Sequence, residues 1–195
     1  MSAEVRRLSL QEAAAAIDDV ARLRIAVFRH WPYLYDGDLA YERDYLGVYA
    51  ENPCAVLVGA FGGGRMVGAS TGTPLTDHAE AFAAPLEGTG WDPAEVFYCA
   101  ESVLLPDWHG QGIGHRFFDA REDAARAMGF AVSVFASVIR PDDHPLRPEG
   151  ARDLAPFWRG RGYAPLDAPP ALFRWRDLGE AEESPKPLGL WWKRL

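Results

Sequence analysis

The sequence has few cysteines and no long apolar run. Its two cysteines, Cys54 and Cys99, lie far apart and form neither a disulfide framework nor a zinc-binding pattern. No apolar segment approaches the roughly 20 residues of a bilayer-spanning helix. The first ten residues also lack the apolar core of a secretory signal. We therefore expect a cytoplasmic protein that has no membrane partner.

Lysine is also scarce, and acidic residues outnumber basic ones. The net charge is -8, and only Lys186 and Lys193 are lysines among the 20 basic residues. Because no basic stripe is present, we expect no nucleic-acid partner. The excess of arginine, together with abundant alanine, suggests a bacterial protein from a GC-rich genome. The five histidines have no metal-ligand spacing, so no metal is expected.

Apolar and aromatic residues are plentiful. Of the 195 residues, 48% are hydrophobic and 12% aromatic, which is enough to build a core and excludes general disorder. The length fits one domain over residues 1–195. No period of about 20 to 50 residues recurs, so a solenoid or propeller is excluded.

The apolar periodicity predicts an alternating order of strands and helices. Ser9 followed by Glu12 is typical of a helix N-terminus. Expected helices cover 13–28, 38–50, 115–128 and 153–159, and expected strands cover 5–10, 55–61, 65–73, 95–105, 131–139, 171–176 and 188–192. This order favours an α/β layer fold with a partly parallel sheet. We expect the last strand at the sheet edge, where Trp191 and Trp192 are available for a homodimer contact.

One segment predicts chemistry directly. The expected strand 95–105 runs into a loop with Gly110, Gly112 and Gly114, which leads straight into a helix. Glycines let such a loop turn with its amides pointing one way. The first N–H groups of a helix have no partner inside it, and together with the helix dipole they form an anion site. A pyrophosphate fits this site without a lysine.

Three other interpretations of these glycines remain open. The dinucleotide fingerprint needs its third glycine one residue later than Gly114. A P-loop needs lysine and serine or threonine after the last glycine, where this chain has His115. The glycines could also form a purely structural turn.

The wider pattern resembles the GNAT N-acetyltransferase superfamily. Residues 104–114, Leu-Leu-Pro-Asp-Trp-His-Gly-Gln-Gly-Ile-Gly, are similar to its acetyl-CoA signature, Arg/Gln-x-x-Gly-x-Gly/Ala between a strand and a helix. His109, Gly112 and Gly114 stand at the three marked positions. Downstream, Phe157-Trp-Arg-Gly-Arg-Gly-Tyr163 is similar to the family's Phe-Tyr-x-x-x-Gly-Phe segment.

The resemblance implies an α/β fold with a GNAT-like mixed central sheet, a splayed pair of strands and helices on both faces. It implies acetyl-CoA as co-substrate, with the splay near residues 102–105. The residues that it assigns to cofactor binding are Val103, Leu104 and Leu105 for the thioester and pantetheine, His109, Gly110, Gln111, Gly112, Ile113, Gly114 and His115 around the pyrophosphate, and Phe157 and Arg159 beside the pantetheine.

The chain departs from the family pattern at three places. His109 replaces the marked arginine or glutamine, which matters little if backbone amides hold the phosphates. Trp158 replaces the tyrosine often proposed to protonate the leaving thiolate, and tryptophan is no useful proton donor. The asparagine that often precedes the last motif helix is missing, since Ala151 and Arg152 stand there.

Two carboxylates are candidate general bases, and one loop is a candidate acceptor site. Glu101 is expected close to the thioester and Glu95 at the start of the same strand. Their structural alternatives are a carboxylate paired with an arginine and an exposed strand end. The acceptor loop between the first two helices carries Trp31, Tyr33, Tyr35, Asp36 and Asp38, which suit a cationic amine. Alternatively, these are core aromatics beside a solvated acidic turn, and His144 is a third possible base.

The sequence therefore favours direct acetyl transfer from acetyl-CoA to an amine of a small molecule or a peptide. Two other functions remain open. One is a non-catalytic acyl-CoA sensor or interaction module, which the replacement of tyrosine by Trp158 suggests. The other is a nucleotide-binding α/β protein.

Overall fold

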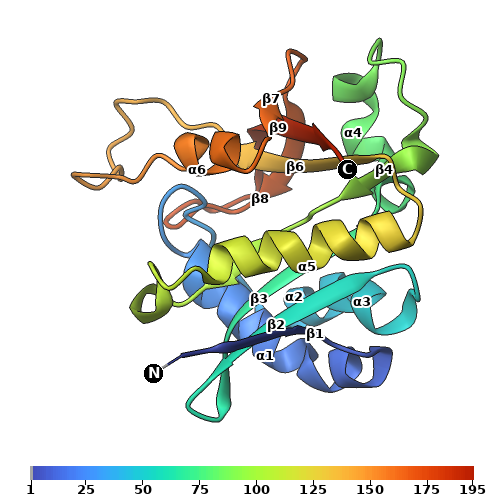
Figure 1. The fold of residues 1–195 in the computed structure, drawn as a ribbon. Helices are drawn as coiled ribbons and strands as arrows, with labels where there is room; N and C mark the ends of the chain where they lie inside the picture. Colours follow the sequence, from blue (N-terminus) through green and yellow to red (C-terminus); the bar gives the residue numbers. More distant parts are fainter. Residues whose placement is uncertain (1) are drawn as a thin grey trace.

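The computed structural model describes residues 2–195, in which the predicted helices and strands occur in the predicted order, together with a further helix at Ala79–Leu86 and a short strand at Ala164–Pro165 (Figure 1). The strands are β1 (Glu4–Arg7), β2 (Val56–Gly62), β3 (Arg65–Pro74), β4 (Val96–Tyr98), β5 (Ser102–Leu104), β6 (Val132–Val138), β7 (Ala164–Pro165), β8 (Ala171–Trp175) and β9 (Ser184–Arg194). The α-helices are α1 (Leu10–Phe28), α2 (Leu39–Leu46), α3 (Val48–Glu51), α4 (Ala79–Leu86), α5 (Ile113–Ala127) and α6 (Ala155–Gly160). Short 3-10 helices are η1 (Leu75–His78), η2 (Pro93–Glu95) and η3 (Pro106–Trp108).

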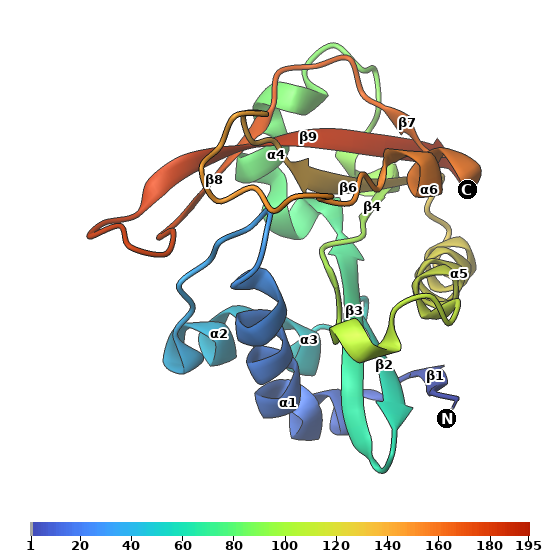
Figure 2. The same cartoon turned by 90° about the vertical axis from the view of Figure 1, so that its left-hand side faces the viewer.

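The strands form one mixed sheet in the order β1-β2-β3-β4-β6-β9-β7, with β5 paired to β3 and β8 paired to β9. Among the described strands, only β4 and β6 pair in parallel. Helices α1 to α3 lie on one side of β2 and β3, and α5 lies on the other (Figure 2). The predicted fold class, a mixed sheet covered by helices on both faces, is confirmed.

Local signals in the sequence explain where α1 begins. The Ser9 side chain accepts a hydrogen bond from the Glu12 N–H, and the Glu12 side chain accepts one from the Ser9 N–H, which completes a capping box. Buried residues then recur at helical spacing and turn one face of α1 toward the sheet; they include Ala13, Ala16, Val20 and Leu23. Among the described residues, no helix is both long and apolar enough to cross a bilayer.

The expected strand 95–105 is broken by a β-bulge. The N–H of Ala100 donates to the Thr71 carbonyl at 3.1 Å, and the N–H of Thr71 donates to the Glu101 carbonyl at 3.0 Å. Two residues thus face one, which is the definition of a bulge. The last bond to β6 runs from the Cys99 N–H to the Val134 carbonyl, at 2.8 Å. Beyond it β5 pairs with β3 alone, which is the predicted splay.

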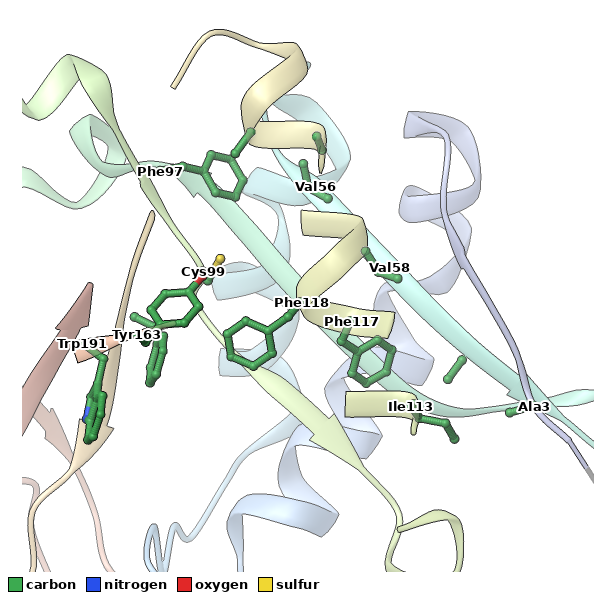
Figure 3. Close-up of a cluster of buried hydrophobic side chains, with 14 of the residues drawn as sticks. Ala3, Val56, Val58, Phe97, Cys99, Ile113, Phe117, Phe118, Tyr163 and Trp191 are labelled. Atoms are coloured by element: carbon green, nitrogen blue, oxygen red, sulfur yellow. The ribbon is translucent and has the colours of Figure 1, made fainter. Parts of the chain in front are cut away.

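The prediction of an edge position for the last strand is wrong. Strand β9 pairs with β6 on one side and with β7 and β8 on the other. The ring of Trp191 is buried and lies 5.0 Å from that of Trp158, in the cluster that fills the space between the sheet and α5 (Figure 3). The ring of Trp192 lies 5.1 Å from that of Trp91. Both tryptophans therefore pack within the chain, and the homodimer stays a prediction without them.

Glu122 connects α5 to the C-terminal half of the sheet. Its buried carboxylate accepts hydrogen bonds from Lys193 at 2.8 Å and from Arg161 at 3.2 Å, and Arg126 lies 3.3 Å away. Burial alone would raise the pKa of Glu122, but Lys193 and Arg161 outweigh it and lower the pKa below its ordinary value. Because the folded pKa is the lower one, this contribution to stability is present above the ordinary value of 4.5 and is lost as the pH falls through the folded pKa.

We therefore expect Glu122→Gln to lower the free energy of unfolding at pH 7 by about 1–3 kcal/mol, because buried donors lose their acceptor. The variant should also lose less stability than the wild type between about pH 5 and pH 3. Urea unfolding at several pH values measures both effects. The control is Asp123→Asn, which alters the exposed neighbour that pairs with Arg126 and should change little. Equal pH profiles for Glu122→Gln and the wild type would contradict this account.

Candidate active site

The glycine loop joins the splayed strand to α5 through one turn of 3-10 helix. The Trp108 and His109 N–H groups donate to the carbonyls of Leu105 and Pro106, each at 3.0 Å, which closes the turn. Gly110 and Gly112 then have φ angles of 76° and 72°, in the left-handed region that favours glycine. A side chain at either position would project into open space. Backbone hydrogen bonds thus hold the turn before the loop, and Gly110 and Gly112 face open space.

The backbone amides of this loop are free. Among the described residues, no hydrogen-bond acceptor meets the N–H groups of residues 110–115, and the next one, at Arg116, donates to the Gly112 carbonyl at 3.3 Å. Gly112 provides no side-chain cap for α5. Consecutive unpaired amides at the positive end of a 15-residue helix are the arrangement that the predicted anion site requires.

The strand that faces the splay presents alternate amides to it. The Leu105 N–H donates to the Val67 carbonyl at 3.0 Å, so it is not available to a cofactor. Alternation along the antiparallel pair directs the Val103 N–H toward β3 as well. The amides that face the splay are therefore those of Leu104 and, one residue earlier than expected, Ser102. Ser102 is exposed although it lies within the sheet.

His109 completes this edge. Its Nε2 lies 3.1 Å from the Leu104 carbonyl oxygen, so a protonated Nε2 donates to that carbonyl. The imidazole thus lies between the strand edge and the glycine loop, where the family signature has arginine or glutamine. It supports the loop connection without any contact to the amides of residues 110–115.

Helix α6 contributes aromatic rings beside the loop. A Cβ on Gly114 would lie 3.5 Å from the Phe157 ring, and the His115 ring is 4.9 Å from it. The Arg159 guanidinium lies 5.4 Å from the centre of the Trp191 ring. Phe157 is therefore next to the anion site, whereas Arg159 is placed along the C-terminal part of the sheet.

Trp158, which stands in place of the family tyrosine, is a packing residue. Its ring packs against those of Phe135 and Trp191, with ring centres 5.1 and 5.0 Å away. The nearby Tyr163 is buried, and its hydroxyl lies 2.8 Å from that of Ser133. Burial raises the pKa of Tyr163 above its ordinary value, so this phenol stays neutral.

Glu101 is held by other side chains. Its buried carboxylate contacts the Arg24 guanidinium of α1 and accepts a hydrogen bond from the Thr71 hydroxyl. Arg24 also contacts Glu42 of α2, so one arginine lies between two carboxylates. The structure therefore favours the structural interpretation of Glu101, a carboxylate paired with arginine, over a free general base.

Glu95 lies at the far end of β4. It is exposed, belongs to the 3-10 turn η2, and receives the Ala131 N–H on its backbone carbonyl at 2.9 Å. Regular strand alternation would put Glu95 and Glu101 on one face, but the bulge changes the parity between them. The structure thus separates the two carboxylates by the length of β4 and does not bring Glu95 to the splay.

The predicted acceptor loop bridges the two halves of the fold (Figure 2). The Asp36 N–H donates to the Arg176 carbonyl at 2.9 Å, and its carboxylate pairs with the Arg176 side chain at 2.7 Å. Tyr35 forms an isolated bridge with Asp177. Asp38 accepts hydrogen bonds from the first N–H groups of α2 and thereby caps that helix. The acidic residues of the loop therefore have structural partners.

The aromatic residues of the loop, Trp31, Tyr33 and Tyr35, are all partly exposed. The Tyr33 ring stacks on Phe28 at 4.1 Å, and burial raises the pKa of Tyr33 to about 12, so it is neutral at pH 7. Trp31 is partly exposed, and its ring lies 5.3 Å from that of His144. Trp31 thus lies beside the proline-rich loop 140–150.

Arg140 binds the backbone of the predicted acceptor loop. Its guanidinium donates to the carbonyls of Pro32 and Tyr33, at 2.9 and 2.7 Å, and pairs with Asp177 at 2.6 Å. Burial alone would raise the pKa of Asp177, but Arg140 and Lys186 lower it below its ordinary value. Arg140 therefore ties the predicted acceptor loop to the segment that follows β8.

Comparisons with known proteins agree with this geometry. The profile of the Acetyltransferase (GNAT) family matches residues 19–148. Among solved structures, the chain is similar to a ribosomal-protein-alanine N-acetyltransferase from Brucella melitensis, with a TM-score of 0.61 and 14% identity over 98% of this chain and 99% of that one. It is also similar to PaiA N-acetyltransferase from Thermoplasma acidophilum in complex with coenzyme A, with a TM-score of 0.55 and 15% identity over 100% of both chains.

A third similar structure is a GNAT superfamily phosphinothricin acetyltransferase from Sinorhizobium meliloti in complex with acetyl-CoA, with a TM-score of 0.56 and 14% identity over 100% of this chain and 89% of that one. A comparison with curated proteins found no match. Because the family profile covers two thirds of the sequence, the chain belongs to the GNAT acetyltransferase family. It is an acyltransferase.

The side chains that could ligate a metal do not gather at the site. Across residues 2–195, no group of three or more His, Cys, Asp or Glu side chains is arranged to hold a metal ion. The glycine loop and the splay present backbone amides and not a cluster of metal ligands.

The anion site predicts that a side chain at Gly112 prevents cofactor binding. We expect Gly112→Val to reduce acetyl-CoA affinity by at least about tenfold, because the side chain occupies the open space in front of the amides. The left-handed φ adds strain of about 1–2 kcal/mol. Isothermal titration calorimetry with acetyl-CoA measures the affinity. The control is Gly90→Val, since Gly90 has the same φ of 72° and open surroundings outside the loop; equal loss in both variants would contradict the assignment.

The Arg24 pair predicts that Glu101 is not the general base. We expect Glu101→Gln to lower kcat by less than about tenfold, because the amide keeps the shape of the carboxylate and can accept from Thr71. Loss of a positioned base costs about 10²–10⁴ and removes one limb of the pH–rate profile. Initial rates between about pH 6 and pH 10 decide between the two, and a vanished limb would restore the catalytic role.

Proposed function

We propose that the protein transfers an acetyl group from acetyl-CoA directly to a primary amine of a small molecule or a peptide. The observation that carries the proposal is the row of free amides at residues 110–115, next to the splayed edge at Ser102 and Leu104. The amides suit the pyrophosphate of the cofactor. The splayed edge then suits its pantetheine arm and thioester.

In the proposed reaction the amine nitrogen attacks the thioester carbon. A C–N bond forms, the C–S bond breaks, and the coenzyme A thiolate leaves with the electron pair. The amine loses one proton and the thiolate gains one, directly or through solvent. The products are an acetylated amine and free coenzyme A.

The magnitudes explain why no strong base is needed. A lysine-like amine in water has a pKa of about 10.4, so its neutral form costs about 4.6 kcal/mol at pH 7. Orientation of two bound reactants supplies about 7–11 kcal/mol. Orientation of the two bound reactants thus lowers the barrier by more than the neutral amine costs. This supports catalysis by a site where Glu101 is paired with Arg24 and Glu95 lies elsewhere.

The remaining assignments belong to the same proposal. Phe157 contacts the cofactor from α6, His109 supports the strand edge, and Arg159 is available to the distal part of coenzyme A. The acceptor enters on the side of the loop that carries Trp31. The arginine-rich composition and the unpaired Cys54 and Cys99 support a bacterial, cytoplasmic enzyme.

One observation favours a second candidate function. Trp158 packs against Phe135 and Trp191 where the family has its proton donor. A protein that only binds acyl-CoA and signals its presence would not need such a donor. This alternative shares the cofactor site with the enzyme and differs from it in lacking turnover.

We expect acetylation of at least one amine when the protein is incubated with acetyl-CoA and a panel of amino acids, polyamines, aminoglycosides and peptides. Release of free thiol gives the rate, and mass spectrometry identifies the acetylated product. Gly112→Val, which lacks the cofactor site, is the control for non-enzymatic acetylation. Tight acetyl-CoA binding without any acetylated product would favour the sensor instead.

A further inference from the structure

Two arginines hold the bulge residue Glu101 from opposite faces of the sheet. From α1, Arg24 contacts the Glu101 carboxylate. From α5, Arg121 Nη1 donates to the backbone carbonyl of Glu101 at 3.0 Å and to that of Thr71 at 3.2 Å. Side chain and backbone of one residue are thus fixed by two different helices. Arg121 belongs to the same helix whose N-terminus carries the anion site.

Arg121 is an unusual choice for mere packing. It is 1% exposed and the largest of the fully buried side chains. Within residues 2–195, no carboxylate oxygen lies within 4.0 Å of its guanidinium; it has two carbonyls and the Phe118 ring, 4.8 Å away, and its Nε has no acceptor. A buried cation without a carboxylate is costly. Its benefit must therefore come from the carbonyls that it holds.

Those carbonyls set the direction of an amide at the splay. The peptide bond between Glu101 and Ser102 is planar and trans, so its C=O and N–H point in opposite directions. Arg121 and the Thr71 N–H hold the Glu101 carbonyl on the β3 side. The Ser102 N–H consequently points away from β3, into the gap between β5 and β6. No acceptor among the described residues meets it.

We propose that Arg121 is a positioning residue for acetyl transfer, which fixes the Glu101–Ser102 peptide so that the Ser102 N–H meets the thioester carbonyl. This inference rests on the proposed function, because it needs acetyl-CoA in the splay. An N–H held in advance at a carbonyl that becomes an oxyanion stabilises the transition state more than the bound substrate. The residue therefore acts on the rate of transfer more than on cofactor affinity.

The test compares kcat with KM in Arg121→Met. Removal of one oxyanion donor costs about 10²–10³ in kcat, and a misdirected donor should cost about 10–100-fold. The KM for acetyl-CoA should change by less than about threefold, since the amides of residues 110–115 do not contact Arg121. Arg121→Lys, which can reach one carbonyl, should recover part of kcat. Arg126→Met removes an exposed arginine of the same helix and should leave both constants unchanged.

A second measurement needs no acceptor. In the wild type, the ¹⁵N–¹H signal of Ser102 should shift when acetyl-CoA replaces coenzyme A, because the two ligands share the pantetheine amides and only acetyl-CoA adds a thioester carbonyl. In Arg121→Met this difference should disappear, while both cofactors still bind. If Arg121→Met fails to fold, the same comparison is made with Arg121→Lys, in which the difference should shrink.

The outcomes separate this inference from the proposed function. If the folded Arg121 variants retain the wild-type kcat and the Ser102 shift, the inference is overturned and the enzyme assignment stands. If kcat and thermal stability fall together and Arg121→Lys recovers neither, Arg121 is structural and the inference is again overturned. If the wild type binds acetyl-CoA without transfer to any amine, the proposed function fails. If the Ser102 shift still depends on Arg121 in that case, Arg121 positions the Ser102 N–H at the thioester carbonyl although no transfer follows.

Discussion

The bulge at Ala100 and Glu101 is the constraint on which the rest of the site depends. Up to Cys99 the chain is bonded to β6, and beyond Glu101 it is bonded only to β3, so the sheet opens at this point. Opening a sheet leaves amides without partners, which is costly unless a ligand or solvent meets them. Here those amides belong to Ser102 and Leu104, and the free amides of residues 110–115 follow them along the chain. One local irregularity thus produces the whole proposed cofactor edge.

Arginine-centred contacts keep this opening rigid. Arg24 and Arg121 fix the bulge from the two faces of the sheet, and Arg140 fixes the acceptor-side loop against Asp177. Glu122 joins α5 to β9 through Lys193. Arginine suits carbonyl-rich positions because its planar guanidinium presents several donors in a fixed geometry. The arginine-rich composition noted in the sequence therefore has a structural use in this fold.

Local patterns in the sequence predict much of the fold and the donor side of the site. The capping box of Ser9 and Glu12 and the glycine loop depend on neighbouring residues, so their spacing reveals them. The bulge, the roles of Ser102 and Arg121, and the central place of β9 depend on pairing between distant segments. Regular alternation would put Glu95 and Glu101 on one face, and the single extra residue of the bulge removes that relation. Nothing in the spacing signals where Arg121 points.

A crystal structure of the protein with acetyl-CoA tests the central claim most directly. The account predicts the diphosphate within hydrogen-bond distance of the amides of residues 110–115, and the thioester carbonyl within that distance of the Ser102 N–H. The Arg121 guanidinium should remain on the Glu101 carbonyl. A cofactor bound elsewhere, or a thioester carbonyl turned away from Ser102, would contradict the account.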